Sequence, residues 1–413
     1  MQETFLTEFQ KRGYFNQCTD RSGLSELMSK GKIKAYIGFD CTAPSLHVGS
    51  LMQIMCLRLL QKYGHQPIVL LGGGTTLIGD PSGKEETRKI LDKKKIDKNI
   101  KSIENVFKIF LKSKNSKTKP IFVNNHSWLS KLNYINFLRE IGKHFTINKM
   151  LTFDSVKLRL EREQSLSYME FNYMMLQAYD FYELNKKYKC ILQIGGSDQW
   201  GNIVNGTDLI KKKDKKQTYG LTTPLLTLSS GAKMGKTEKG AIWLNKKMLS
   251  PYDYWQFWRN TDDKDVINFL KLFTDLNLAQ IDSLKNSNQD INKLKILLAN
   301  QTTCMLHGSK AAQDSETTAQ KTFGDKSIGK DLPIIKIKKD VLISGLNILD
   351  LVLQTKLANS KSEIRRMIKN NGLKINNEVV IDETKIINQD NFDKDNNMKV
   401  SHGKKQHVVI KII

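Results

Sequence analysis

Apolar residues in the first half of the chain fall into short runs separated by stretches with helical spacing. Residues 34–40 and 67–71 are apolar runs rich in β-branched and aromatic side chains, which indicates strands. Between them, residues 46–63 carry apolar side chains four positions apart, which predicts a helix. Runs at 121–123 and 190–194 indicate two more buried strands. Strands that alternate with helices form mostly parallel sheets, so the pattern predicts an α/β, Rossmann-like domain.

The second half of the chain has a different pattern. From residue 251 to about 317, Leu, Ile and Phe recur at a spacing of 3.6 residues, which predicts an α-helical domain. We expect residues 1–225 to form the sheet domain and 226–320 a loop followed by the helical domain. Residues 321–341, with two glycines, a proline and several lysines, look like a linker. The last segment, 342–413, is expected to form a small α+β domain.

Charge adds a partner to this picture. The 413 residues include 66 Lys and Arg against 42 Asp and Glu, a formal net charge of +24. Such an excess favours a polyanionic partner such as RNA, although a chain this rich in Lys, Asn and Ile could also reflect the nucleotide composition of the genome.

No apolar run approaches the roughly 20 residues of a membrane helix. The acidic start lacks a basic stretch leading into an apolar core, so we expect a cytoplasmic protein. Five widely spaced cysteines, without a C-x-x-C pair, suggest reduced thiols and no structural metal.

The segment after the first strand has the composition of a phosphate site. The strand ends at Asp40, the chain turns at Pro44, and Ser45 is a suitable N-cap for the following helix. His47 would then lie in the first helical turn, beside unpaired backbone N–H groups that favour anions. Gly49 would let a ligand approach the helix closely.

Two further strands end in glycine-rich segments. Residues 72–74 are three glycines, and parallel-sheet proteins bind nucleotides at such strand exits. The dinucleotide pattern G-x-G-x-x-G does not fit, because Leu77 stands at the third glycine position. Residues 195–202, Gly-Gly-Ser-Asp-Gln-Trp-Gly-Asn, place polar side chains directly after another strand. These side chains are expected at the carboxyl edge of the sheet.

A fourth segment, residues 231–237, is a lysine-rich loop. It nearly matches a P-loop, but that motif would need glycine where the chain has Ser230. A P-loop phosphotransferase is therefore disfavoured, and a mobile basic loop that closes over phosphates fits better.

Together these segments resemble class I aminoacyl-tRNA synthetases, specifically the bacterial-type tyrosyl enzymes. Residues 45–50 are similar to the His-Ile-Gly-His signature of that class, and residues 233–237 to its Lys-Met-Ser-Lys-Ser loop. Residues 36–40, 173–181 and 195–202 are the more selective matches. The resemblance covers essentially the whole chain. It implies tyrosine–tRNA ligase activity, with L-tyrosine, ATP with Mg²⁺ and tRNA(Tyr) as partners.

The resemblance also implies roles for individual residues. The tyrosine site would comprise Tyr36 and Asp180 at the phenol hydroxyl, Tyr173, Gln177 and Asp80 at the ammonium group, and Gln199 near the carboxylate. The AMP portion would meet Asp40, Gly49, Ser50, Gly196 and Asp198. The γ-phosphate would meet Thr42 and His47, and the leaving pyrophosphate would meet Lys84, Arg88, Lys233, Lys236 and Thr237. Ser50 departs from the family, which has histidine there, so a shorter hydroxyl would have to reach the ribose.

The end of the chain has its own basic motif. Ser360 and Glu363 form a capping-box pattern that opens a helix, and four cations then fall on one face: Lys361, Arg365, Arg366 and Lys369. Gly372 should end this helix, and a hairpin is expected around Asn376-Asn377. The segment resembles a small RNA-binding module shared with a ribosomal protein, which implies contact with tRNA.

The resemblance further implies a homodimer whose interface lies in an insertion at about 124–190. Trp128, Phe137 and Phe145 are candidates for its buried contacts. Two other functions share much of the pattern. A tryptophanyl ligase has the same fold and loops but would not need Tyr36 and Asp180 to read a phenol. A non-catalytic RNA-binding relative would not need to retain the charged site residues.

Overall fold

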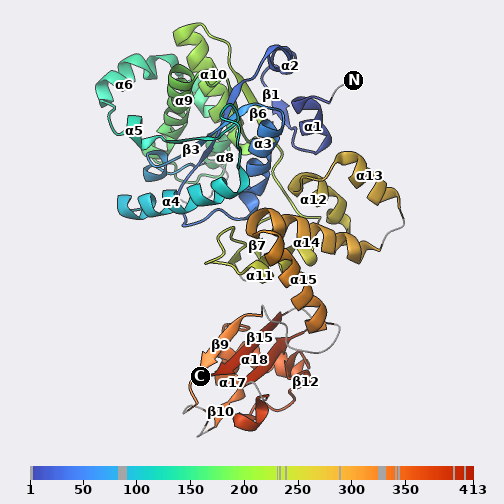
Figure 1. Cartoon of the computed structure of the whole chain (residues 1–413). Coiled ribbons are helices and arrows are strands. Elements are labelled where there is room, and N and C mark those ends of the chain that lie inside the picture. Colours follow the sequence, from blue (N-terminus) through green and yellow to red (C-terminus); the bar gives the residue numbers. More distant parts are fainter. Residues whose placement is uncertain are drawn as a thin grey trace. The chain divides into compact units, whose positions relative to one another are not determined.

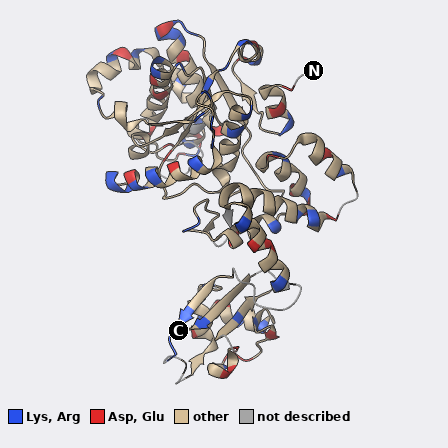
Figure 2. Cartoon of the chain, in the orientation of Figure 1, with Lys and Arg blue, Asp and Glu red and all other residues tan. Residues whose placement is uncertain are grey.

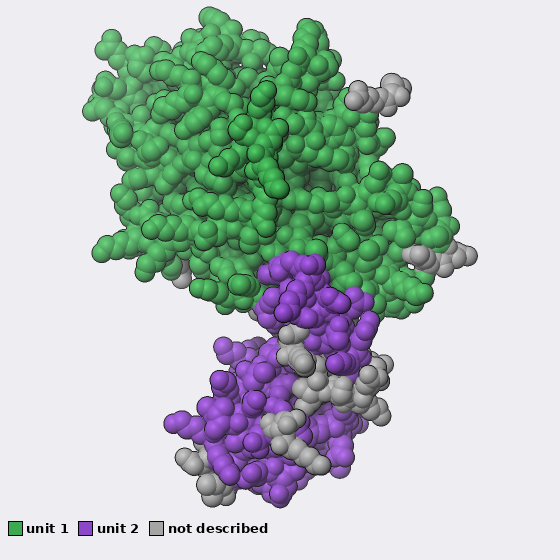
Figure 3. Space-filling model, in the orientation of Figure 1, with its two compact units in different colours: residues 1–249, 257–306 green, residues 250–256, 307–413 purple. Residues whose placement is uncertain are grey.

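The computed structural model describes residues 3–81, 91–229, 231, 234–237, 240–287, 290–323, 332–339, 342, 345–393, 396–403 and 406–413. The chain forms two compact units (Figure 3). Unit 1 comprises residues 1–249 and 257–306, and unit 2 comprises residues 250–256 and 307–413. Lys and Arg are spread over both units rather than gathered in one (Figure 2).

A six-stranded sheet forms the centre of unit 1 (Figure 1). Its strand order is β1-β6-β5-β2-β3-β4, and every neighbouring pair is parallel except β1 and β6. The strands are β1 (Gln17–Cys18), β2 (Lys34–Phe39), β3 (Gln66–Leu71), β4 (Ile121–Asn124), β5 (Leu192–Gly196) and β6 (Tyr219–Thr223). The four predicted strands and the parallel α/β fold are thus confirmed. In β2, β3 and β5 the residues of these apolar runs are buried along almost the whole strand, whereas in β4 only Val123 is buried.

Helices pack against this sheet, and a second group of helices follows it in the chain. Helix α3 contacts β2, β3 and β5, and α10 contacts β5 and β6. The helices up to residue 214 are α1 (Phe5–Lys11), α2 (Arg21–Lys30), α3 (Leu51–Lys62), α4 (Lys93–Phe110), α5 (His126–Leu129), α6 (Tyr134–Glu140), α7 (Ile147–Leu151), α8 (Asp154–Glu161), α9 (Tyr168–Tyr188) and α10 (Trp200–Asp214). The later helical region, predicted from its spacing, contains α11 (Pro251–Arg259), α12 (Val266–Phe273), α13 (Leu278–Asn286), α14 (Ile291–His307) and α15 (Ser309–Phe323).

The order of the strands creates a crevice in unit 1. From β2 the chain adds β3 and β4 on one side and then β5 and β6 on the other. The ladder between β2 and β5 holds only two residue pairs, Ala35–Leu192 and Tyr36–Gln193, so β2 runs on beyond it. Open α/β sheets bind ligands outside the carboxyl ends of the strands at such a switch point.

The segment after β2 differs from the prediction. We expected an α-helix from residue 46 with Ser45 as its N-cap, but α3 begins at Leu51. A single 3-10 turn, η1 (Val48–Ser50), precedes it, and its N-cap is His47. The hydroxyl of Ser45 is buried and donates to the carbonyl of Leu46 instead. The prediction was wrong because His47 Nδ1 accepts from the N–H of Gly49 at 3.0 Å, which makes histidine the capping residue.

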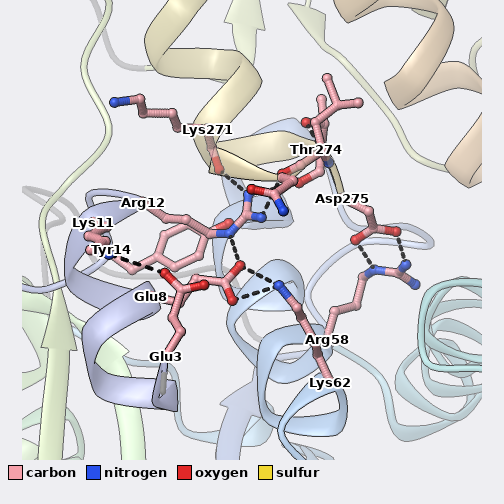
Figure 4. A network of polar contacts seen from close by, with 12 residues as sticks. Glu3, Glu8, Lys11, Arg12, Tyr14, Arg58, Lys62, Lys271, Thr274 and Asp275 are labelled. Atoms are coloured by element: carbon pink, nitrogen blue, oxygen red, sulfur yellow. Dashed lines mark hydrogen bonds and ion pairs between the residues drawn. The ribbon is translucent and has the colours of Figure 1, made fainter. Parts of the chain in front are cut away.

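A buried carboxylate joins the N-terminal helix to α3 and to the helical region of unit 1 (Figure 4). Glu8 of α1 accepts hydrogen bonds from Arg12 (2.7 Å), from Lys62 (2.7 and 2.6 Å) and from Tyr63 (2.6 Å). The guanidinium of Arg12 also donates to the carbonyl of Lys271 in the last turn of α12 and to those of Thr274 and Leu276 in the connection to α13. Arg58 of α3 pairs with Asp275 in the same connection. We call these contacts the Glu8 network.

Unit 2 contains a separate hydrophobic core. Its main sheet has the order β12-β11-β14-β15-β9, antiparallel throughout except for the β15–β9 pair. The elements in this region are β9 (Ile334–Ile337), β10 (Leu346–Asn347), α17 (Ile348–Gln354), α18 (Lys361–Lys369), β11 (Leu373–Ile375), β12 (Glu378–Val379), β13 (Ile386–Ile387), β14 (Asn397–His402) and β15 (Gln406–Ile412). The predicted hairpin is β11–β12, with Asn376 and Asn377 at positive φ.

Three details of unit 2 differ from expectation. The segment expected to be a linker includes β9, because residues 334–337, three isoleucines and a lysine, add a strand beside β15. After α18 the left-handed residue is Asn371, at φ 52°, rather than Gly372. The capping box is half formed: Ser360 accepts from the N–H of Glu363, whereas the Glu363 carboxylate accepts from the N–H of Asn359.

Among the described residues, no helix is long and apolar enough to span a membrane.

Candidate active site

A cavity of about 330 Å³ lies at the carboxyl ends of β2 and β5, where the crevice was expected. Eleven of the predicted site residues line it, namely Tyr36, Asp40, Gly49, Ser50, Asp80, Tyr173, Gln177, Asp180, Gly196, Asp198 and Gln199. They come from β2, β5, α9 and the connecting segments. Helix α9 contributes Tyr173, Gln177 and Asp180 from a single face, because these positions are spaced i, i+4 and i+7.

Tyr36 and Asp180 form a buried polar end of the cavity. The hydroxyl of Tyr36 is buried and has no hydrogen-bond partner among the described protein groups. The Asp180 side chain is 1% exposed and accepts from Asn125 Nδ2 at 2.8 Å and from Trp128 Nε1 at 2.7 Å. Each carboxylate oxygen therefore keeps acceptor capacity beyond its protein donor. A buried hydroxyl in this position would satisfy Tyr36 and Asp180 together.

The environment of Asp180 changes its ionisation. Burial raises its pKa to about 7, although the hydrogen bonds from Asn125 and Trp128 oppose the rise. The charge of Asp40 raises it further. Burial likewise raises the pKa of the Tyr36 phenol, with a contribution from the nearby charge of Asp180. Tyr36 is therefore a hydrogen-bonding phenol at neutral pH, while Asp180 can hold or release a proton.

A chain of hydrogen bonds connects this polar end to the second carboxylate of the cavity. Asn125 Nδ2 donates to Asp180 and, at 3.0 Å, to the hydroxyl of Thr75. Thr75 donates to Asp40 Oδ1 at 3.0 Å, and the phenol of Tyr173 donates to Asp40 Oδ2 at 3.2 Å. The Asn125 side chain is itself held, because its Oδ1 accepts from the N–H of Gly74 at 2.7 Å. The two carboxylates are thus oriented by one polar network.

A second network orients the residues expected at the amino end of the substrate. Gln199 Nε2 donates to Asp80 Oδ2 at 2.9 Å, and Asp80 is buried. Asn202 Nδ2 donates to Gln199 at 3.1 Å and to Gln177 at 3.0 Å. Asp80, Gln177 and Gln199 therefore form one cluster of acceptors and amides. Asn202, on the first turn of α10, holds this cluster together.

Sequence reasoning missed four residues of these networks: Thr75, Asn125, Trp128 and Asn202. Asn125 follows a predicted strand at the carboxyl edge of the sheet, which is a signal that could have identified it. Trp128 was considered for a subunit interface, but it is buried inside this chain. Phe137 is buried in the same core, and Phe145 is half-buried against it.

The phosphate-binding residues expected from the sequence are only partly described. Thr42 is exposed and His47 is half-buried, and neither lines the cavity, whereas Gly49 and Ser50 beside them do. Lys84, Arg88 and Lys233 lie outside the described residues. For Lys236 and Thr237 the structure describes the backbone, which forms β7 (Lys236–Thr237) paired with β8 (Gly240–Ala241).

In unit 2, helix α18 buries Ile364, Met367 and Ile368 and exposes its other face. The exposed face carries the four predicted cations, Lys361, Arg365, Arg366 and Lys369. Lys361 pairs with Asp350 at 2.6 Å and Arg365 with Glu383 at 3.4 Å. Both pairs are solvent-exposed and therefore weak, so the cations can exchange these partners for others.

Comparisons with known proteins were made for the whole chain. The profile of the family "tRNA synthetases class I (W and Y)" matches residues 28–324, and that of the "Tyrosine--tRNA ligase SYY-like C-terminal domain" matches residues 325–410. A tyrosine–tRNA ligase from Pelagibacter ubique (strain HTCC1062) is 65% identical over 409 residues, which cover 99% of each chain. One from Rickettsia rickettsii (strain Sheila Smith) is 52% identical over 99% of this chain and 100% of its own.

Solved structures agree with these matches. The crystal structure of a C-terminally truncated mitochondrial tyrosyl-tRNA synthetase from Aspergillus nidulans is 30% identical to this chain and has a TM-score of 0.71. The match covers 78% of this chain and 95% of that chain. The tyrosyl-tRNA synthetase of Archaeoglobus fulgidus, solved with L-tyrosine, has a TM-score of 0.56 at 17% identity and so shares the fold.

Proposed function

The chain belongs to the tyrosine–tRNA ligase family of class I synthetases, and on this premise we propose how its cavity activates L-tyrosine with ATP. The observation that carries the proposal is that one cavity is lined by both the unpartnered, buried hydroxyl of Tyr36 and the buried carboxylate of Asp180. The substrate phenol donates to Asp180 and accepts from Tyr36. Phenylalanine would leave both groups unpaired, and a site of this kind rejects such an analogue strongly, with tyrosine-activating enzymes themselves as the standard example. A tryptophanyl ligase has no use for this pair.

The other end of the amino acid is held by the amide cluster. The carboxylate of Asp80 and the amide oxygen of Gln177 accept from the substrate ammonium group, and the Tyr173 phenol adjoins them. Gln199 fixes Asp80 and directs its remaining N–H toward the substrate carboxylate. Asp40, Gly196 and Asp198 face the AMP portion, and Ser50 occupies the position expected to meet its ribose.

The first reaction requires alignment rather than a protein nucleophile. A carboxylate oxygen of tyrosine attacks the α-phosphorus of ATP, the bond to the bridging oxygen breaks, and pyrophosphate leaves. ATP enters as its magnesium complex. His47, Thr42 and the cations Lys84, Arg88, Lys233 and Lys236, with the hydroxyl of Thr237, stabilise charge that develops on the leaving group.

The second reaction transfers tyrosine to RNA. A hydroxyl of the 3′-terminal adenosine of tRNA(Tyr) attacks the carbonyl carbon of the adenylate, and AMP leaves. The exposed cations of α18 bind the phosphate backbone of the tRNA, because Lys and Arg release counterions from it. This reaction is part of protein synthesis, which we place in the cytoplasm.

We also propose that the chain acts as a homodimer through the insertion at 124–190. Large apolar side chains are exposed there, among them Tyr134 (57%), Ile135 (67%) and Tyr168 (66%). They border an apolar groove lined by Leu129, Phe137, Leu138 and Leu176. Exposed apolar patches of this kind mark interaction sites, and a second copy of the chain offers the same surface across a twofold axis.

The activity is tested by amino-acid-dependent ATP–pyrophosphate exchange with each of the twenty amino acids. Exchange with tyrosine alone is expected from the wild-type protein. Asp180→Ala should lower it at least about 100-fold, because the phenol loses a charged acceptor. Glu183→Gln, three residues further along α9 and outside the cavity, is the matched control and should retain activity. Near-normal exchange by Asp180→Ala would refute the phenol assignment.

A further inference from the structure

The hairpin that follows the lysine-rich loop docks on the turn that carries His47. Beyond β8, the N–H of Val48 donates to the carbonyl of Ile242 at 2.9 Å, and the N–H of Leu244 donates to the carbonyl of Leu46 at 2.9 Å. The backbones of His47 and Trp243 form an antiparallel bridge between these two bonds. The His47 turn and the hairpin are therefore one hydrogen-bonded assembly within unit 1.

Trp243 lies against the imidazole of His47. Their ring centroids are 6.2 Å apart and the ring planes are inclined at 73°, an edge-to-face arrangement. Ile242 and Leu244 are buried whereas Trp243 is half-buried. Because side chains alternate along an extended segment, the two neighbours face the core and Trp243 faces the opposite side, toward His47. The indole thus does not fill the core with its neighbours.

The imidazole is fixed from a second direction. Its Nδ1 accepts from the N–H of Gly49 at 3.0 Å. A neutral ring that accepts at Nδ1 carries its proton at Nε2, which is then the nitrogen that can donate to a ligand. The Gly49 bond fixes the tautomer, and the contact with Trp243 limits rotation of the ring.

Glycine at position 235 permits this close docking. Gly235 has φ +100°, and a Cβ there would lie 2.8 Å from His47 Nδ1 and 2.6 Å from the backbone nitrogen of Gly49. A Cβ on Gly49 would lie 3.1 Å from the carbonyl oxygen of Met234. The hairpin can reach the imidazole only because both positions lack side chains.

We propose that Trp243 is a positioning residue for the activation step: it holds the imidazole of His47 in the orientation that donates to the phosphates of ATP. The proposal rests on the proposed function, because the orientation of His47 matters only if His47 meets ATP. The same hairpin carries Lys236 on its other strand, β7. Trp243 does not line the cavity that contains Tyr36 and Asp180.

The test compares Trp243→Ala with Trp243→Phe in the exchange assay, with KM for ATP and for tyrosine measured separately. Trp243→Ala should lower the maximal exchange rate about 3- to 10-fold, the range that an aromatic pair is worth. KM for tyrosine should stay within about twofold of the wild type, since the phenol site is untouched. Trp243→Phe keeps an aromatic ring and should stay close to wild type. If Trp243→Ala does not fold, Trp243→Leu keeps apolar bulk without the ring and should show the same loss.

A double-mutant cycle separates positioning from a general structural role. In a His47→Ala background, Trp243→Ala should have little further effect, because its action passes through the imidazole. Equal effects of Trp243→Ala in both backgrounds would overturn the proposal, as would a Trp243→Ala enzyme with the wild-type rate. Asn245→Ala is the control on the same segment. The side-chain amide of Asn245 donates a hydrogen bond to the hydroxyl of Ser102 in α4 and not to the His47 turn, so this variant should exchange at the wild-type rate. A wild-type protein that shows no exchange with tyrosine would refute the proposed function itself.

Discussion

The indole nitrogen of Trp128 donates a 2.7 Å hydrogen bond to Oδ1 of Asp180, and both side chains are buried. The two residues are 52 positions apart, on α5 and α9. Burial makes the charged form of Asp180 unfavourable, and the donors from Trp128 and Asn125 partly offset that cost. The ionisation of Asp180, the acceptor that we propose for the substrate phenol, therefore depends on two residues that do not line the cavity.

Tyrosine binding should depend on pH through Asp180. Its pKa is about 7, so the fraction that is protonated grows as the pH falls below 7, and a protonated carboxyl accepts less well from a phenol. We expect KM for tyrosine to rise as pH falls from 8 to 5.5, approaching about tenfold per pH unit at the acid end. In Asp180→Asn, whose side chain does not titrate, KM for tyrosine should not follow this profile. Exchange assays with tyrosine on both proteins across this range check the prediction, and parallel profiles would contradict it.

Trp128→Phe should move this pH dependence. The variant keeps an aromatic ring but loses a hydrogen bond that lowers the pKa of Asp180, so that pKa should rise. At pH 7 the enzyme would then hold more protonated Asp180, and KM for tyrosine should increase by roughly 10-fold. The same pH series measures the shift. Phe137→Leu, in the same core but without a bond to Asp180, serves as the control for altered packing.

Glu8→Ala should destabilise unit 1 strongly. The change leaves Arg12 buried without its carboxylate, and breaking a buried pair costs about 3–5 kcal/mol. Urea unfolding followed by circular dichroism gives the difference in the free energy of unfolding. Glu26→Ala, which breaks an exposed pair with Lys30, should cost less than about 1 kcal/mol. A similar small change for Glu8→Ala would show that the Glu8 network contributes little.

The Glu8 network should also fail in acid. Burial alone would raise the pKa of Glu8, but hydrogen bonds from Lys62, Tyr63 and Arg12 outweigh it and hold that pKa below the usual 4.5. A lowered folded-state pKa stabilises the fold above pH 4.5, and this contribution is lost as pH falls through the folded value. Wild type and Glu8→Ala should therefore converge in stability at low pH, as measured by unfolding at pH 3 and pH 7.

Removing residues 324–413 should separate the two reactions. The cavity lies wholly in unit 1, so tyrosine-dependent exchange should stay within a few-fold of wild type. Charging of tRNA should fall by at least about 100-fold, because the basic face of α18 is lost. A deletion that begins at residue 342 would be harder to interpret, because it keeps β9 but removes β15, the strand with which β9 pairs. Retention of both reactions would exclude this region as the RNA contact.

The homodimer can be tested by charge on the exposed apolar surface. Ile135→Glu should weaken self-association, which sedimentation equilibrium detects as a fall from twice the chain mass toward the single-chain mass. Leu225→Glu is the matched control for self-association, because Leu225 is also apolar and exposed (56%, against 67% for Ile135) but lies outside residues 124–190. If Ile135→Glu remains as associated as the wild type, the interface lies elsewhere.

The sequence was sufficient to predict four of the six strands of the sheet and eleven of the residues that line the cavity. Strands such as 67–71 are continuous apolar runs because both faces are covered, and parallel strands place the residues that follow them at one edge. Tyr36, Asp180 and Gln199 were assigned through the resemblance of their segments to the tyrosyl family, and the fold brings all three to one cavity.

The parts that were missed depend on long-range contacts. In the sequence, Trp128 looks like any buried apolar residue. Its hydrogen bond to Asp180 on α9 joins residues that are far apart in the chain, so the local sequence pattern could not predict it. The capping role of His47 was hidden because serine is the commoner N-cap and Ser45 stood two residues earlier. Strand β9 was taken for a linker because only its pairing with β15 distinguishes it from an irregular segment.

The hydroxyl of Tyr36 is buried without a partner among the described protein groups. This unpaired hydroxyl affects the stability of the folded chain as well as the choice of substrate. An unpaired buried polar group costs about 1–3 kcal/mol, and bound tyrosine would remove that cost only in the folded chain. Tyrosine would therefore act as a folding ligand, and its concentration would set how often the chain opens to proteases. A cell short of tyrosine would not only charge less tRNA but would also hold a shorter-lived enzyme, so amino-acid supply and enzyme lifetime would fall together.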